Sequence, residues 1–346
     1  MRSIPVTRSA RLGIAFVCLA ATAPLVADAQ DGLNATQSVA AAYEKYKGLA
    51  EGKNADYIPA LAKVDPKIFG IALITADGKV FTAGDVTTEV SIQSISKVFT
   101  MARVIQDSGE AAIRNNMGVD ATGVRFNSIV AIELNKGGEM NPLVNPGAIA
   151  ATSMVGGGSS DAIWANILGT YEDFAGRKLS VLQDVYKSES ETNQRNQAIA
   201  MLMHAYGRIK NNPQQATDLY TRQCSVGVNA RDLAMMAATL ANGGRNPVTG
   251  KQAVSADHVP AILAVMATAG LYDDTGKWLY LTGLPGKSGV GGGLIAVSPG
   301  KFGIAVVSPP LDAAGNSVRG QKAIADISSV LGGNPFASRP RALARQ

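Results

Sequence analysis

The chain contains few cysteine, histidine and aromatic residues, and the shortage of the first two excludes a disulfide-stabilised fold and a typical structural zinc site. Of its 346 residues, 2 are cysteine, 2 are histidine and 5% are aromatic. Cys18 lies in the N-terminal leader described below, so Cys224 has no partner for an internal disulfide. Two histidines and one cysteine are too few for a typical structural zinc site. With 46% hydrophobic and 17% charged residues, the composition excludes a disordered or collagen-like chain and predicts a globular protein.

The first 30 residues have the pattern of a leader for export. Three arginines precede an apolar run over 12–27, and the small residues Ala27 and Ala29 mark a cleavage position. We predict a signal peptide over 1–29, cleaved near Ala29, and an exported, periplasmic protein. A transmembrane anchor is the alternative, and it is disfavoured because the run is short and no stop-transfer flank follows it.

The net charge gives no support for a nucleic-acid partner. The formal charge is +5, and loss of the leader with its three arginines and one aspartate lowers it to about +3. Such a value is too small to indicate a nucleic-acid surface. The only basic cluster lies in the segment 336–346, which we expect to be a flexible, solvated tail.

Strand patterns occur at both ends of the chain, and helical periodicity fills the middle. Two β-rich runs flank the turn Asp77-Gly78 and predict a hairpin. Strands are predicted over 68–74, 79–83, 278–281, 293–298 and 302–308, and helices over 36–50, 229–242 and 316–331. Thr36 is expected to cap the first of these helices, and Asn229 with Asp232 the second.

This order of elements predicts an α+β fold with an antiparallel sheet built from N- and C-terminal strands. We expect an α/β sheet subdomain over 30–93 and 272–335, flanked by helices. The mostly helical segment 94–271 is predicted to be an insertion that forms a second subdomain.

One serine–lysine pair has the spacing of a nucleophile and its base. Ser94 and Lys97 lie at the start of a predicted helix, where residues three apart share a face, so the lysine amine can reach the serine hydroxyl. A serine needs a base to remove its proton, and lysine serves only if burial or cationic neighbours lower its pKa. Spacing alone does not single out this pair, because Ser298 and Lys301 repeat it on a predicted turn.

A second segment completes an arrangement typical of penicillin-recognising serine enzymes. Lys287, Ser288 and Gly289 lie at the edge of a predicted strand, before Val290 and three glycines. Glycine lets a main chain approach a substrate closely, and the amides of Val290 and Ser94 are expected to form an oxyanion hole. The alternative is a flexible loop between strands. Ser-x-x-Lys on a helix, followed by Lys-Ser-Gly on a strand, predicts a β-lactamase-like fold.

Seven segments in order resemble the serine-dependent glutaminases, a family within the β-lactamase and penicillin-binding-protein superfamily. The resemblance covers roughly residues 40–332, and the segments that carry it are 93–98, 141–150, 185–189, 195–200, 220–225, 270–273 and 283–293. The chain departs from the expected pattern at Pro146, at 269–271 and at Trp278, but the side chains that matter for chemistry are present.

The resemblance implies a role for particular residues. Ser94 is the implied nucleophile, with Lys97 beside it and the Val290 N–H as an oxyanion donor. The implied substrate contacts are Ser94, Asn145, Glu189, Asn196, Tyr220, Tyr272 and Val290. Tyr220 is the first candidate for a proton relay with Lys97 and Tyr272 the second, and Lys287 and Ser288 are expected to support the site.

Glutamine matches these side chains chemically. Its α-ammonium suits Glu189, and its α-carboxylate suits Asn145, Asn196 and a tyrosine hydroxyl. Each residue also has a purely structural interpretation: a solvated carboxylate for Glu189, a turn at the start of a helix for Asn145, a helix cap for Asn196, and half-buried core positions for the tyrosines. Cys224 is expected to be a small buried residue and not a nucleophile.

We therefore predict a glutaminase, an amidohydrolase that converts L-glutamine to L-glutamate and ammonia through an acyl-enzyme, without a cofactor or metal. One alternative is a β-lactamase, D-Ala-D-Ala peptidase or esterase of the same fold, although no Ser-x-Asn or Tyr-x-Asn motif is evident. Another is a non-catalytic periplasmic glutamine binder, against which the intact Ser94–Lys97 pair argues. The expected partners are L-glutamine and further copies of the chain in a homodimer or homotetramer, with no nucleic acid and no stable membrane anchor.

Overall fold

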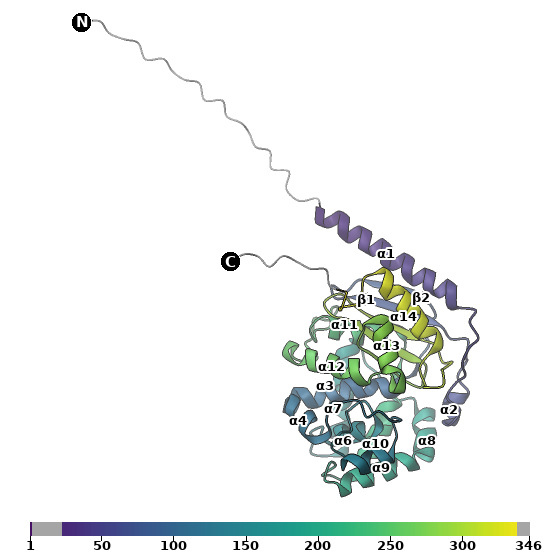
Figure 1. Ribbon diagram of the computed structural model, residues 1–346, viewed down its shortest axis with the longest axis vertical. Coiled ribbons are helices and arrows are strands. Elements are labelled where there is room, and N and C mark those ends of the chain that lie inside the picture. Colours follow the sequence, from purple (N-terminus) through teal and green to yellow (C-terminus); the bar gives the residue numbers. More distant parts are fainter. Residues whose placement is uncertain (2–22, 338–346) are drawn as a thin grey trace.

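The computed structural model describes residue 1 and residues 23–337, with side chains from Asn34 onward in the second of these parts (Figure 1). The leader predicted over 1–29 and the tail predicted over 336–346 therefore lie largely outside the described residues, and cleavage near Ala29 stays a prediction. The helices are α1 Ala23–Tyr46, α2 Pro59–Ala62, η1 Gln93–Ile95, α3 Ser96–Ser108, α4 Glu110–Met117, α5 Ile129–Asn135, α6 Asn145–Ser153, α7 Ser160–Ala175, α8 Gln183–Thr192, α9 Gln194–Ala205, α10 Pro213–Cys224, α11 Ala230–Ala241, η2 Ala256–His258, α12 Val259–Ala269, η3 Tyr272–Asp274, α13 Thr275–Thr282 and α14 Val318–Val330. The strands are β1 Gly70–Thr75, β2 Val80–Gly84, β3 Val90–Ser91, β4 Gly227–Val228, β5 Gly286–Ser288, β6 Gly293–Ser298 and β7 Phe302–Val307.

One antiparallel sheet joins the two ends of the described chain. Its order is β2-β1-β7-β6-β5, so the N-terminal hairpin β1–β2 lies next to the C-terminal strand β7. Ala72 of β1 pairs with Ala305 of β7, and Leu73 of β1 pairs with Phe81 of β2 across the predicted turn. The predicted α+β fold, with a sheet made from both termini, is confirmed.

The two faces of the sheet belong to different hydrophobic cores, because successive side chains of a strand point to opposite sides. Ile71 and Leu73 of β1 pack with α1, α13 and α14. Ala72 and Ile74, from the alternate positions of the same strand, pack with the core that includes α3, α10 and α11. Figure 1 shows α1 in purple beside α14 in yellow at one end of the molecule, and α6, α8, α9 and α10 at the other end.

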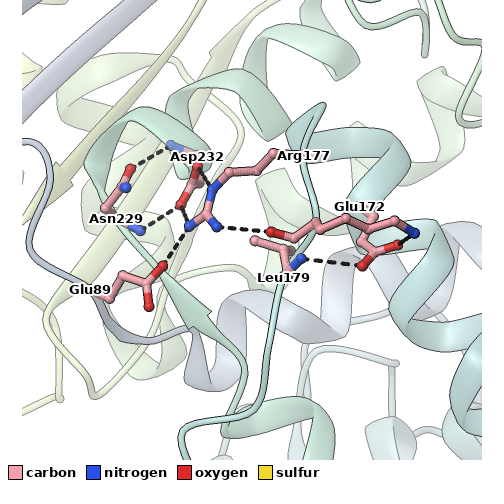
Figure 2. A network of polar contacts seen from close by, with 7 residues as sticks. Glu89, Glu172, Arg177, Leu179, Asn229 and Asp232 are labelled. Carbon is pink, nitrogen blue, oxygen red and sulfur yellow. Dashed lines mark hydrogen bonds and ion pairs between the residues drawn. The ribbon is translucent and has the colours of Figure 1, made fainter.

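Helix α11 lies directly against the sheet and begins as the sequence predicts. The Asn229 side chain accepts from the Asp232 N–H, and the Asp232 carboxylate accepts from the Asn229 N–H, which makes a capping box. Asp232 also accepts from Arg177, which lies just after the end of α7, and Arg177 also donates to Glu89 (Figure 2). This polar network ties α7, α11 and the segment before β3 together.

The structure corrects two of the predicted boundaries. The segment 278–281, predicted as a strand, belongs to helix α13, where Thr275, Trp278 and Thr282 are buried at helical spacing. The Trp278 indole donates to the Leu284 carbonyl at 2.7 Å, so packing decides the conformation of this β-rich stretch. Helix α1 runs through Thr36 and does not begin there, and it ends at Tyr46.

Candidate active site

Ser94 lies in the short turn η1 between β3 and α3. Its side chain is 8% exposed, and the following residues continue without a break into α3. The preceding residue, Gln93, has φ of 50°, a conformation that non-glycine residues rarely adopt. A strained residue thus directly precedes the predicted nucleophile, as is frequent at functional sites.

Lys97 is buried one turn into the same helical segment, with 1% of its surface exposed. Its Nζ donates to Asn145 Oδ1 at 2.7 Å and to the Leu143 carbonyl at 3.4 Å. These two bonds hold the amine in place, and within the described residues it makes no hydrogen bond to the Ser94 hydroxyl. Burial lowers the pKa of Lys97 from 10.5 to about 8, while the carboxylate of Glu189 opposes this change. An amine with such a pKa is able to accept a proton near neutral pH.

The two candidate relay tyrosines occupy different sides of this pair. The Tyr220 hydroxyl donates to Asn145 Oδ1 at 3.2 Å, and its ring centroid lies 5.8 Å from Lys97 Nζ. The Tyr272 hydroxyl contacts Ser94 and donates to the Ser288 carbonyl at 3.2 Å. Burial raises the pKa of Tyr272 to about 12, and the contact with Ser94 opposes that rise. Tyr272 is therefore the neighbour of the serine, and Tyr220 the neighbour of the lysine and its amide partner.

Lys287 and Ser288 lie on the edge strand β5, and both contact Tyr272. Lys287 Nζ donates to the Gly270 carbonyl at 2.8 Å and to the Ser288 carbonyl at 2.7 Å. It also lies 4.3 Å from the centroid of the Tyr272 ring, and burial holds its pKa well below the usual value. Ser288 Oγ donates to Asn316 Oδ1 at 2.6 Å, and the Asn316 amide donates to the carbonyl just before Tyr272. These contacts fix Tyr272, whose own φ is 54°.

A cavity of about 260 Å³ opens in front of Ser94. Six of the residues that the sequence predicts as substrate contacts line it: Ser94, Asn145, Glu189, Asn196, Tyr220 and Val290. Tyr272 lines the adjacent cavity of about 1030 Å³, and Phe126 and Arg195 border both. The structure therefore brings together side chains that are up to about 200 positions apart in the sequence.

Glu189 supplies a carboxylate to this cavity. It accepts from Gln93 Nε2 at 3.2 Å and from Ser225 Oγ at 3.4 Å. Burial raises the pKa of Glu189 to about 7, although both hydrogen bonds and the charge of Lys97 work in the opposite direction. A carboxylate that lines a cavity in this way is suited to receive a cationic group of a ligand.

Asn196 completes the polar wall next to Asn145. Asn145 Nδ2 donates to Asn196 Oδ1 at 2.9 Å. Since Asn145 Oδ1 already accepts from Lys97 and Tyr220, both ends of this amide are fixed by neighbours. Asn196 makes no further side-chain hydrogen bond within the described residues, so its Nδ2 is left to donate to a bound anion.

Some residues of the site were not found by sequence reasoning. Gln93 lines the cavity and contacts Glu189, and its position next to Ser94 was the only signal in the sequence. Tyr57 borders the cavity with 57% of its surface exposed, and Phe126 lies 4.9 Å from the Tyr272 ring, centroid to centroid. Both come from irregular segments, where no periodic pattern marks a contributing side chain.

Cys224 is the one cysteine of the described residues, and it lies close to the candidate site. Cys224 is buried, and burial raises the pKa of its thiol to about 12, so it is protonated at neutral pH as the sequence predicts. Within the described part of the chain, no three histidine, cysteine, aspartate or glutamate side chains gather as a metal site would require. In the same residues, no helix combines the length and apolar character needed to cross a membrane.

The sheet, the helices around it and the buried serine–lysine pair define a protein of the β-lactamase-like fold class. Comparison with known proteins gives the family. The Glutaminase family matches residues 52–336. The chain is 55% identical over 295 residues to a glutaminase of Colwellia psychrerythraea, which covers 85% of this chain and 95% of that protein. It is 50% identical over 310 residues to a glutaminase of Brucella suis, with coverage of 88% and 98%. The chain therefore belongs to the glutaminase family.

Solved structures agree with this assignment. The structure of a probable glutaminase, ybaS, superimposes with a TM-score of 0.87 at 46% identity and covers 88% of this chain and 99% of its own. A probable glutaminase from Bacillus subtilis, complexed with 6-diazo-5-oxo-L-norleucine, superimposes with a TM-score of 0.79 at 27% identity and coverage of 87% and 96%. The predicted family and fold are confirmed.

Proposed function

We propose that this protein hydrolyses L-glutamine to L-glutamate and ammonia through a covalent γ-glutamyl ester on Ser94. The observation that carries the proposal is a small cavity lined by Ser94, three positions along the chain from a buried lysine whose pKa is about 8. Membership of the glutaminase family supports glutamine as the substrate.

The first half of the reaction forms the ester. The Ser94 Oγ attacks the side-chain carbonyl carbon of glutamine while its proton passes to the neutral amine of Lys97. The carbonyl oxygen becomes an oxyanion, which the main-chain N–H groups of Ser94 and Val290 stabilise. The carbon–nitrogen bond then breaks, the nitrogen takes the proton from Lys97, and ammonia leaves.

The second half repeats the chemistry with water. A water molecule gives its proton to Lys97 and adds to the ester carbonyl carbon, again with an oxyanion at the Ser94 and Val290 amides. The bond between this carbon and the Ser94 oxygen breaks, the oxygen regains the proton, and glutamate is released.

Lys97 Nζ donates to Asn145, and we propose that a tyrosine hydroxyl assists the transfer of the proton between serine and lysine. The contact of the Tyr272 hydroxyl with Ser94 favours Tyr272 for this exchange, and the contact of Tyr220 with Asn145 favours a role beside the lysine. We expect Tyr272→Phe to lower kcat more than Tyr220→Phe. The reverse order in steady-state kinetics would assign the relay to Tyr220.

The charges of the cavity match the α-amino acid part of the substrate. Glu189 is the partner for the α-ammonium, because it is the carboxylate that lines this cavity. The Nδ2 of Asn196 is the donor for the α-carboxylate. Asn145 holds Asn196 in place, and the Tyr220 hydroxyl in turn donates to Asn145. In this orientation the side-chain amide of glutamine points toward Ser94.

The decisive experiment is the release of ammonia by purified Ser94→Ala protein. The variant should lose activity on glutamine, whereas Ser96→Ala, two positions along the same segment, should keep it. Ammonia release at the wild-type rate from Ser94→Ala would refute the assignment. Parallel assays with asparagine and a chromogenic cephalosporin test the other amidohydrolase chemistries of this fold, and saturable glutamine binding without ammonia would indicate a binding protein.

The leader pattern supports export, and we propose that the mature protein begins near Gln30 in the periplasm. N-terminal sequencing of protein from a periplasmic extract tests this, with an intact leader as the contrary result.

We also propose a homodimer or homotetramer. An interface between copies would cover exposed apolar side chains such as Leu134 and Tyr280, which are 76% and 89% accessible. Light scattering at micromolar concentration measures the mass, and a monomer would contradict this.

A further inference from the structure

Four polar side chains form a buried network behind the serine–lysine pair. They come from four helices: Thr100 of α3, Thr152 of α6, Tyr171 of α7 and Gln223 of α10, each at most 1% exposed. Gln223 Oε1 accepts from Thr100 Oγ1 at 2.9 Å and lies 3.2 Å from Thr152 Oγ1, whose hydroxyl is shared with the Ala148 carbonyl at 2.8 Å. The Thr100 and Tyr171 hydroxyls are 2.6 Å apart.

Three of these helices also carry residues of the candidate active site, at spacings that place both sets on one face. Thr100 follows Lys97 by three positions and Gln223 follows Tyr220 by three, which is one helical turn in each case. Thr152 follows Asn145 by seven positions, which is two turns. The fourth helix reaches the site through the main chain, because the Tyr171 hydroxyl donates to the Ser96 carbonyl at 3.0 Å, between Ser94 and Lys97.

The network is not the arrangement that stability alone would favour. Gln223 Nε2 is buried and has no hydrogen-bond partner among the described residues. A buried donor without a partner is costly, and apolar side chains of similar volume would fill this space without that cost. Buried polar networks do, however, fix the relative positions of the elements that they join. The 2.7 Å bond between Lys97 and Asn145, which joins α3 to α6, requires such fixed positions.

We propose that the network of Thr100, Thr152, Tyr171 and Gln223 positions the lysine, amide and tyrosine of the active site against the reactive serine. Its members are positioning residues, since none of them lines the cavity in front of Ser94. The proposal rests on the proposed function, because it concerns how that reaction obtains its base.

The consequence for catalysis acts through Lys97. The titratable groups that face its amine are Glu189 of α8, Tyr220 and Cys224 of α10, and Lys287 of β5. Breaking the network lets α3 move relative to α6 and α10 and admits water to the amine. Burial is what lowers the pKa of Lys97, so access of water should raise it again toward 10.5. The rise in kcat with pH should then occur at higher pH than in the wild type.

The experiment compares Thr100→Val and Tyr171→Phe with wild-type protein in steady-state kinetics from pH 6 to pH 10. Both variants should lower kcat by about tenfold and change KM by less than about threefold, with the rise in kcat displaced to higher pH. Thr100→Ser, which keeps the hydroxyl, should restore both properties. The double variant should lose little more than either single variant, because one network is broken in each case.

Thr217→Val is the matched control. Thr217 is a buried threonine on α10, and among the described residues its hydroxyl bonds within that helix alone, to the Pro213 carbonyl at 2.8 Å. This variant should keep the wild-type kcat and pH profile. Folding of each variant is checked by circular dichroism, and Tyr171→Phe, which removes a single oxygen atom, decides the question if Thr100→Val does not fold.

Two results would overturn the proposal, and they differ. If the wild-type protein releases no ammonia from glutamine, the proposed function fails and the network has no reaction to serve. If the wild type is active and folded Tyr171→Phe and Thr100→Val retain its kcat and pH profile within about twofold, the proposed function stands and the network is only structural.

Discussion

Replacing Lys97 with methionine should abolish glutamine hydrolysis and, at the same time, stabilise the folded protein. The lysine is 1% exposed, and burial lowers its pKa from 10.5 to about 8. At pH 7 the folded protein therefore holds a charged group in a place that disfavours charge. A change in pKa of this size corresponds to about 3 kcal/mol of unfolding free energy. Loss of the hydrogen bond to Asn145 offsets about 1 kcal/mol of the gain, which leaves roughly 2 kcal/mol.

The dependence on pH separates this cause from better packing by methionine. Below pH 8 both the folded and the unfolded wild type bind the proton, so the penalty is present in full. Between pH 8 and pH 10.5 only the unfolded chain binds it, and the stability of the wild type rises with pH across this interval. The advantage of Lys97→Met should therefore be largest at pH 7 and should fade toward pH 10.5.

Urea unfolding followed by circular dichroism at pH 7 and pH 10 measures both effects. Lys210→Met provides the control, because Lys210 is exposed and its replacement should change the unfolding free energy by less than about 0.5 kcal/mol. The reasoning is refuted if Lys97→Met is less stable than wild type at pH 7, or if its advantage is the same at pH 10.

Three further predictions concern binding and folding. The KM for glutamine should rise as the pH falls below about 7, because Glu189 then gains a proton and no longer attracts the ammonium group of the substrate. A KM that is constant from pH 6 to pH 8 would contradict this. Gly303→Ala should destabilise the protein by about 3 kcal/mol in thermal unfolding, because an added Cβ would lie 2.0 Å from the main-chain nitrogen of Ala238 in α11. A stability close to that of the wild type would show that α11 is free to shift. Arg177→Ala should cost about 2 kcal/mol, because Asp232, with 7% of its side chain exposed, loses its cationic partner and, among the described residues, keeps only the bond from the Asn229 N–H (Figure 2). Glu89→Gln should cost less than about 1 kcal/mol, since that pair is exposed, and equal effects of the two variants would contradict this.

Local signals explain why much of the fold could be predicted from the sequence. The Asp77-Gly78 turn between β-rich runs and the Asn229–Asp232 capping box are encoded within a few residues, and both occur as predicted. Trp278 was predicted in a strand because its neighbours are β-rich, but its indole packs under the sheet from a helix. Such a choice depends on contacts between distant segments, and a local pattern does not contain them.

Some residues of the candidate site could likewise be predicted from the sequence, and others could not. Motif positions such as Glu189 and Asn196 were found because family resemblance identifies residues one by one, and the structure places them on one cavity. Gln93, Phe126 and Asn316 were missed, since each takes its place from a contact with a segment far away in the chain. Asn316 is connected to the site indirectly, through hydrogen bonds to Ser288 and to the main-chain carbonyl just before Tyr272. Only the folded structure shows this connection.

Backbone strain and buried charge concentrate around the reactive serine. Of the three non-glycine residues with positive φ in the described chain, Gln93 precedes Ser94 and Tyr272 contacts it. The two buried lysines of the same residues, Lys97 and Lys287, are also found here. Each of these features opposes folding, so each persists only because the helices and strands around it leave no alternative. Lys97→Met separates the two demands: the stability gained with the loss of activity measures the folding free energy that the protein gives up to bury an ionisable amine beside its nucleophile.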